Sequence, residues 1–225
     1  MSALLPHVLE NIPRPFLVVC EGYGDAQFIC SLLEFRNVTN CNVGCPSTKG
    51  GTGSGKEAVQ KYLGAVRALV LQGKANLTGV LVIVDADDKP KEAFDQMAAA
   101  FEDAQFIRPS QAFTIEGTDP RVAVYLIPGP GRTGTLEHIL LEAIFDKNQS
   151  VERCILTFSE CLGGHMDSGT DNQKAKMRMS VLAGAFCKDN PWTPLSLIWK
   201  DANNPIPLDS DRFKHVSDFL SAFVA

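Results

Sequence analysis

The hydrophobic pattern divides the chain into short apolar runs that alternate with longer amphipathic segments. Residues 16–20, 79–84 and 121–127 are short, largely apolar runs rich in β-branched side chains, which predicts buried strands. A weaker run at 40–46 predicts a further strand. Apolar residues at helical spacing predict helices over 26–35, 56–70, 90–101, 136–144, 151–162, 173–187 and 213–223.

Strands that alternate with helices predict an α/β fold. Because each strand is nearly all apolar, we expect a parallel sheet with helices on both faces. The chain length suits a single domain over 1–225, with a core of about 15–148 and a short helical C-terminal extension of about 149–225. The connecting segments are predicted as an entry segment at 1–14, a loop plus a short strand at 106–119, a polar loop at 163–169 and loop-rich chain at 191–207.

The composition excludes several protein classes. Of the 225 residues, 45% are hydrophobic and 21% are charged, which excludes a disordered, collagen-like or coiled-coil chain. No run approaches the roughly 20 apolar residues of a membrane-spanning helix, and the first twenty residues lack a secretory signal pattern. Seven cysteines, an odd number, suit reduced thiols, so we expect a cytoplasmic protein without a membrane partner.

The net charge of −5 gives no general attraction to nucleic acid. A polyanion would therefore have to be held locally, or through a metal ion.

Two of the predicted strands end in acidic residues. Glu21 follows the first strand, with Asp25 four residues later, and Asp85 and Asp87 follow the strand at 79–84. Ligands of open α/β sheets bind beyond the carboxyl ends of the strands. If the two strands are neighbours, these carboxylates converge, and bringing like charges together is costly without a cation. Oxygen ligands of this kind suit Mg²⁺ or Mn²⁺. The alternative interpretation is that the acids merely form turns and cap helices.

The spacing Glu21-Gly-x-x-Asp25, followed by Asp85-x-Asp87 after an apolar strand, resembles the Toprim domain. That domain is shared by type IA and type II topoisomerases, primases, small ribosomal-RNA maturases and overcoming-lysogenization-defect nucleases. The resemblance implies a Toprim-like, Rossmannoid sheet in which Glu21 acts as a general acid/base or metal ligand and Asp85 and Asp87 hold Mg²⁺. In the nuclease branch an acid one turn after the glutamate also binds metal, and Asp25 occupies that position here.

The chain also resembles a small Toprim-related family long described only as a domain of unknown function. The matching pieces are short and span most of the chain: Gly50-Gly51, Gly134-Thr135-Leu136-Glu137, Lys174-Ala175-Lys176, Leu182-Ala183 and the segment from Phe213 to Phe219-Leu220. Their order is the stronger signal. The resemblance makes Glu137 a candidate metal ligand, whereas its place near a helix start is equally typical of an acid that complements the helix dipole.

Basic residues supply candidates for phosphate contacts. Nuclease relatives use a lysine downstream of the Asp-x-Asp strand, and Lys176 is the matching candidate for stabilising charge on the phosphate. Lys174 and Arg178 are candidate nucleic-acid contacts on the same predicted helix, although a solvated helix face is the alternative interpretation for all three residues.

The segment 50–56 nearly matches a P-loop. It ends in Gly55-Lys56, but Glu57 replaces the Ser or Thr whose hydroxyl would bind Mg²⁺. We therefore expect a loop that enters a helix at Lys56 and offers phosphate contacts.

The sequence favours Mg²⁺- or Mn²⁺-dependent cleavage of a phosphodiester bond in nucleic acid, with Glu21 and Lys176 as catalytic residues. Two alternatives stay open. A nucleotide-binding or phosphotransfer enzyme using the 50–56 loop would lose nucleotide binding in Lys56→Ala. A non-catalytic Toprim-fold module that binds a protein partner, as in a phage-defence complex, would tolerate Asp85→Ala and Asp87→Ala.

Overall fold

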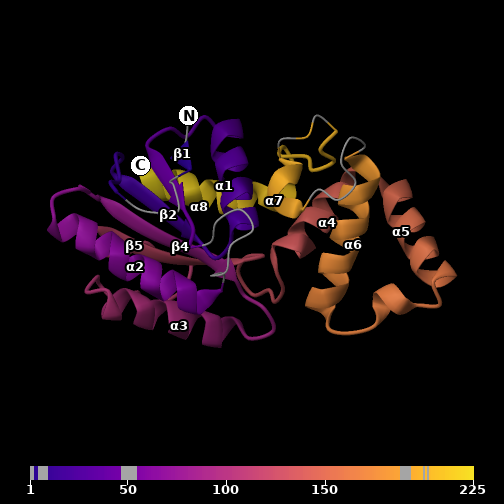
Figure 1. Ribbon diagram of the computed structural model, residues 1–225, viewed down its shortest axis with the longest axis horizontal. Coiled ribbons are helices and arrows are strands. Elements are labelled where there is room, and N and C mark those ends of the chain that lie inside the picture. The colour runs from indigo at the N-terminus through magenta and orange to yellow at the C-terminus, as the bar shows by residue number, and fades with distance from the viewer. Residues whose placement is uncertain (1–2, 5–9, 47–54, 188–193, 200, 202) are drawn as a thin grey trace.

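A parallel β-sheet forms the centre of the fold. The computed structural model describes residues 3–4, 10–46, 55–187, 194–199, 201 and 203–225. Within these residues the sheet has five strands in the order β1-β3-β2-β4-β5 (Figure 1). They are β1 (Ala3–Leu4), β2 (Phe16–Cys20), β3 (Cys41–Gly44), β4 (Gly79–Asp85) and β5 (Arg121–Ile127).

The two strands that precede the acidic turns are neighbours. β2 pairs with β4 in parallel register, from Phe16 opposite Gly79 to Cys20 opposite Ile83. Every residue of β2 is buried, as is every residue of β4 except Asp85. Because the two strands run in the same direction and end together, the acids that follow them meet at one edge of the sheet.

Helices cover both faces of the sheet, as the apolar strands predict. α2 (Lys56–Leu71) and α3 (Pro90–Asp103) pack on one face, against residues such as Leu17 and Val19. α1 (Tyr23–Phe35) and α8 (Lys214–Val224) pack on the other face, against Val18 and Phe16. Alternate side chains of one strand thus enter different halves of the core. Figure 1 shows α2 and α3 below the sheet and α1 and α8 above it.

The remaining helices gather on one side of the molecule, at the right of Figure 1. They are α4 (Leu136–Lys147), α5 (Gln149–Cys161), α6 (Asp171–Phe186) and the short α7 (Leu195–Ile198). Two short 3₁₀ turns, His165–Asp167 and Asp211–Phe213, precede α6 and α8. The contacts of α4 with α6 place the N-terminal turns of both helices near the carboxyl edge of the sheet.

The predicted α/β fold with a parallel sheet, flanking helices and a C-terminal helix is confirmed. Three details were wrong. The first helix begins at Tyr23 rather than at 26, because Asp25 accepts a hydrogen bond from the Gly22 N–H and caps the helix start. No strand forms within 106–119, where only an isolated bridge joins Glu116 to Val122. The entry segment contributes the two-residue strand β1, which is too short to leave a periodic pattern.

The membrane prediction can also be compared with the described helices. None of them is both long and apolar enough to cross a bilayer.

Candidate active site at the carboxyl edge of the sheet

The first acidic turn is short and continues directly into a helix. Glu21 follows the last residue of β2, and Gly22 adopts an extended conformation before α1 begins at Tyr23. Asp25, in the first turn of α1, accepts a hydrogen bond from the Gly22 N–H with N···Oδ2 2.9 Å. A carboxylate in this position satisfies an N–H group at the helix start and complements the helix dipole.

The second acidic turn is held by other elements. Asp85 ends β4, and its Oδ1 accepts a hydrogen bond of 2.9 Å from the Leu136 N–H at the start of α4. Its own backbone N–H lies 3.4 Å from Oε2 of Glu21, which links the two turns. Asp87 has a φ of 51°, and its backbone exchanges hydrogen bonds of 2.9 and 2.8 Å with Gly134. Aspartate tolerates this left-handed conformation better than most residues.

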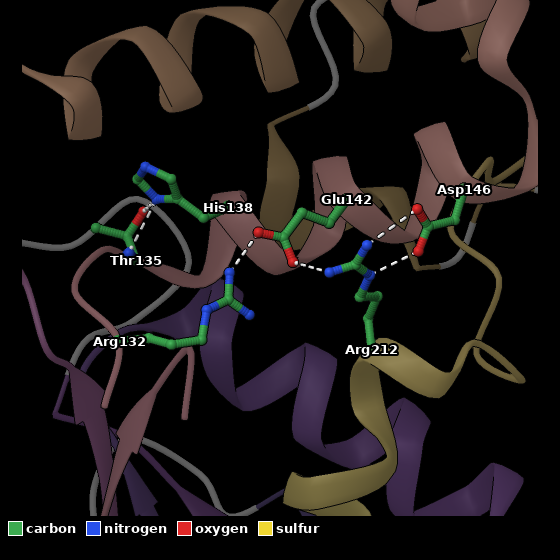
Figure 2. Close-up of polar contacts among 6 residues, drawn as sticks. All are labelled: Arg132, Thr135, His138, Glu142, Asp146 and Arg212. Carbon is green, nitrogen blue, oxygen red and sulfur yellow. Dashed lines mark hydrogen bonds and ion pairs between the residues drawn. The ribbon is translucent and has the colours of Figure 1, made fainter. Parts of the chain in front are cut away.

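The start of α4 is shaped by a compact cap. Gly134 has a φ of +122°, which favours glycine, and a Cβ there would lie 2.9 Å from Nδ1 of His138. Nδ1 of His138 accepts a hydrogen bond of 3.0 Å from the Thr135 N–H, as Figure 2 shows. The Thr135 hydroxyl donates to Oε2 of Glu137 at 2.7 Å. The cap thus fixes the position of Glu137, which directly follows Leu136, the residue whose N–H donates a hydrogen bond to Asp85.

A line of alternating charges anchors the body of α4. Arg132 donates to Glu142, which also accepts from Nη1 of Arg212 at 3.0 Å (Figure 2). Arg212 holds Asp146 through two further hydrogen bonds of 2.6 and 3.1 Å. Since Arg212 lies just before α8, this network ties the helix that carries Glu137 to the C-terminal part of the chain.

Four carboxyl groups interact at the edge of the sheet. Burial raises the pKa of Asp25 to about 7, with further increases from the charges of Glu21 and Glu137. Burial also raises the pKa of Asp85 well above its usual range, and Asp25, Glu21 and Glu137 add to that increase against the opposing Leu136 hydrogen bond. Carboxyl groups shift in this way when they are desolvated beside like charges. The structure therefore brings the predicted acids of both turns and of α4 into one electrostatic group.

Two lysines offset part of this negative charge. Nζ of Lys56, at the start of α2, lies 2.5 Å from Oδ2 of Asp87 and 3.8 Å from Oε2 of Glu21. Burial raises the pKa of Glu21, whereas Lys56 and, more weakly, Lys176 lower it, so that a net increase remains. The exposed Lys176 thus lies close enough for its charge to act on Glu21.

The other basic candidates on α6 serve a different surface. Lys174 pairs with Asp171 at 2.9 Å, and Arg178 pairs with Asp167 at 2.5 Å. Lys174 and Arg178 line a cavity of about 290 Å³ between α4 and α6, next to His138. Lys174 and Arg178 are four residues apart and therefore lie on one face of α6, whereas Lys176 lies on a different face. For this reason Lys174 and Arg178 do not join the group of carboxylates.

The carboxylate oxygens at this edge are of the type that a divalent cation binds, but in the part of the chain that the structure describes they are not arranged as a complete set of metal ligands. The acids supply hard oxygen ligands, and their mutual repulsion is what a bound cation would relieve. In the described ranges, however, no three acidic, histidine or cysteine side chains stand as a set of metal ligands. Lys56 occupies oxygen atoms of Asp87 and Glu21 that such an ion would use.

Sequence reasoning missed two parts of the site. Asn172, in the first turn of α6, donates from Nδ2 to Oδ1 of Asp87 at 3.3 Å. Asn172 lies four residues before Lys176 and therefore on the same face of the helix, and this spacing could have indicated it from the sequence. Lys56 was expected to contact phosphate through the glycine-rich loop, but in the structure it contacts carboxylates. Most of that loop, including Gly50-Gly51, lies outside the described residues.

A family model matches almost the whole chain, over residues 15–224. It is described as "Protein of unknown function (DUF3226)". The chain belongs to the DUF3226 family. No curated protein and no solved structure was found to match it. The DUF3226 match includes every candidate site residue, from Glu21 to Arg178.

Proposed function

We propose that this DUF3226 protein is a Toprim-type enzyme that uses Mg²⁺ or Mn²⁺ to cleave phosphodiester bonds in nucleic acid. The observation that carries the proposal is the single electrostatic group formed by Glu21, Asp25, Asp85 and Glu137 at the carboxyl edge of the sheet. Buried carboxyl groups with raised pKa values beside one another are typical of functional sites rather than of turns. The strand-end positions of Glu21, Asp85 and Asp87 are those that the Toprim resemblance implies.

The residues divide into three roles in this proposal. Glu21, Asp85 and Asp87 would hold the metal, with Asp25 and Glu137 as further ligands or as supporting charges. A bound Mg²⁺ would position the scissile phosphate, activate water and stabilise the leaving oxygen. The Toprim resemblance also implies that Glu21 transfers a proton. In the metal-free protein, burial raises the pKa of Glu21 above its usual range. Lys176 neutralises charge on the phosphate from the exposed face of α6.

The wider setting is proposed on the same resemblance. The resemblance supports a Toprim-like core with a C-terminal helical extension and a protein partner in a defence complex. The proposed cytoplasmic location rests instead on the odd number of cysteines and the lack of a secretory signal pattern. Lys174, Arg178 and Lys56 are then candidate contacts to the nucleic-acid backbone. These contacts would give an acidic protein a local means of holding a polyanion.

The test joins metal binding to cleavage. Calorimetric titration with MgCl₂ and MnCl₂ is performed on wild type and on Asp85→Asn/Asp87→Asn. Plasmid, linear duplex, single-stranded DNA and RNA are then incubated with each protein in the presence of metal. We expect the double variant to lose metal binding and to reduce cleavage by about 100-fold or more. Asparagine keeps an oxygen that can accept the Leu136 hydrogen bond.

Asp88→Asn is the matched control, because Asp88 is exposed in the same turn. Circular dichroism confirms that each variant is folded. The proposal fails if wild type binds neither metal at millimolar concentration, or if the double variant cleaves as fast as wild type.

A further inference from the structure

Lys56 is the cation that lies between the two acidic turns. It begins α2, on the opposite side of β2 from α1, and its ammonium bridges Asp87 and Glu21 at 2.5 and 3.8 Å. The Lys56 side chain is only 14% exposed and that of Glu21 21%, whereas that of Asp87 is 45% exposed, so the ammonium lies between a mostly buried and a partly exposed carboxylate. A lysine at a helix start is an unexpected choice, since the N-terminal end of a helix favours acids.

The charge of Lys56 is maintained by its neighbours. Burial alone would lower its pKa, but the hydrogen bond to Asp87 and the charges of Glu21, Asp87 and Asp85 outweigh burial and raise it. The side chain is therefore a permanent cation in a cluster of acids. It provides the compensation that like-charged carboxylates need when no metal is bound.

Lys56 also borders an open space. A cavity of about 280 Å³ lies beside the second acidic turn. Its polar lining residues are Lys56, Asp87, Asp88, Lys89, Glu92 and Gln96. A small displacement of the flexible lysine side chain would carry its ammonium from the carboxylates into this cavity. Lysine suits such movement, because its charge is compact and its stem has four carbon atoms.

We propose that Lys56 is an internal counter-cation that a divalent metal ion displaces, and that the released ammonium binds a phosphate group of the substrate at the cavity. The inference rests on the proposed metal site and adds a coupling to it. Metal and ammonium compete for Asp87 and Glu21, so the phosphate-binding form of Lys56 arises when metal binds. This coupling reconciles the predicted phosphate contact of Lys56 with its observed contact to carboxylates.

The first test measures competition. Lys56→Met removes the charge and retains an unbranched side chain, whereas Lys61→Met is the control, because Lys61 is exposed on the same helix. Titration with MgCl₂ should give a Kd about tenfold lower for Lys56→Met than for wild type, because the metal no longer displaces a cation. Lys61→Met should bind Mg²⁺ like wild type.

The second test needs no variant of Lys56. Wild-type protein is treated briefly with an amine-acetylating reagent with and without MgCl₂, and acetylation of each lysine is measured by mass spectrometry. We expect Mg²⁺ to increase acetylation of Lys56 several-fold and to leave Lys61 unchanged. Asp85→Asn/Asp87→Asn should show no response of Lys56 to Mg²⁺.

The outcomes separate this inference from the proposed function. If wild type binds Mg²⁺ but Lys56→Met binds it equally or more weakly, displacement is refuted and the metal site stands. Unchanged acetylation of Lys56 in Mg²⁺-saturated protein refutes it in the same way. If neither wild type nor Lys56→Met binds Mg²⁺, the metal site and the displacement both fail.

Discussion

The two acidic turns both place carboxyl groups at the same edge of the sheet, but they are built differently. In the first turn, Asp25 is held by the N–H of Gly22, three residues away. In the second turn, Asp85 is held by Leu136, and Asp87 by Lys56 and Asn172, which come from three different helices. The contact of Asp25 can form as soon as its helix forms. The contacts of Asp85 and Asp87, and those of Glu21 with the Asp85 N–H and Lys56, require the packed molecule. The comparison indicates that the geometry of the Asp-x-Asp pair depends on the tertiary structure.

The largest expected effect on stability comes from removing the charge of Asp25 in the first turn. Asp25 has a pKa of about 7 in the folded protein, above the roughly 3.9 of an unfolded aspartate. Its folded form binds more protons, so its contribution to stability is complete below pH 4 and is lost as the pH rises from about 4 to 7. In metal-free buffer, Asp25→Asn should remove this loss and stabilise the protein at pH 8 by a few kcal/mol, at about 1.4 kcal/mol per pKa unit.

Urea denaturation in EDTA at pH 5 and pH 8 measures this effect. Asp88→Asn, an exposed aspartate of the second turn, is the control and should change neither value much. An equal fall in stability between the two pH values for wild type and Asp25→Asn would contradict the assigned burial and repulsion at Asp25.

The next largest effect is the difference in stability between alanine substitutions of two glycines, one near each acidic turn. Gly134, which pairs with Asp87, has a φ of +122° and lacks room for a Cβ beside His138. Gly134→Ala should destabilise the protein by about 1–3 kcal/mol. Gly22 has a φ of −137°, and a Cβ there would meet only the Asp25 carboxylate at 3.1 Å. Gly22→Ala should cost less than about 1 kcal/mol.

Thermal denaturation of both alanine variants measures whether Gly134→Ala loses more stability than Gly22→Ala. Equal losses of stability would mean that the second turn is no more constrained than the first.

A smaller effect concerns a distant charge that acts on Glu21 of the first turn. Lys176 on α6 lowers the pKa of Glu21, although 155 positions separate them in the chain. Lys176→Met should reduce metal-dependent cleavage about tenfold while leaving Mg²⁺ affinity nearly unchanged. Lys174→Met is the comparison on the same helix: Lys174 pairs with Asp171 and lines the other cavity, so as a proposed contact to the nucleic-acid backbone it should raise KM rather than lower kcat.

The pH dependence of cleavage provides a second readout. Loss of Lys176 should shift the acidic limb, assigned to Glu21, to higher pH, because a favourable positive charge is removed. Equal cleavage by wild type and Lys176→Met would remove Lys176 from the site. Equal losses for Lys174→Met and Lys176→Met would show a general effect of charge on α6 instead.

Local patterns in the sequence were enough to predict the fold class and the candidate acids. Apolar runs of strand length predict the buried strands β2, β4 and β5, and helical periodicity predicts the helices between them. Both signals are local, because burial on two faces leaves almost no polar residue in a strand. The acids that follow β2 and β4 were visible for the same reason, since each stands directly after an apolar run.

The way in which those acids are held depends on how the elements pack together. The pairing of β2 with β4 makes their ends neighbours, and the packing of α4 and α6 brings Leu136 and Asn172 to the second turn. Lys56 was assigned to phosphate from its loop, yet its ammonium crosses to Asp87, because the acids leave an unpaired negative charge there. Such contacts join residues 31 to 85 positions apart. They depend on which elements pack together, and periodicity along the chain carries no information about that choice.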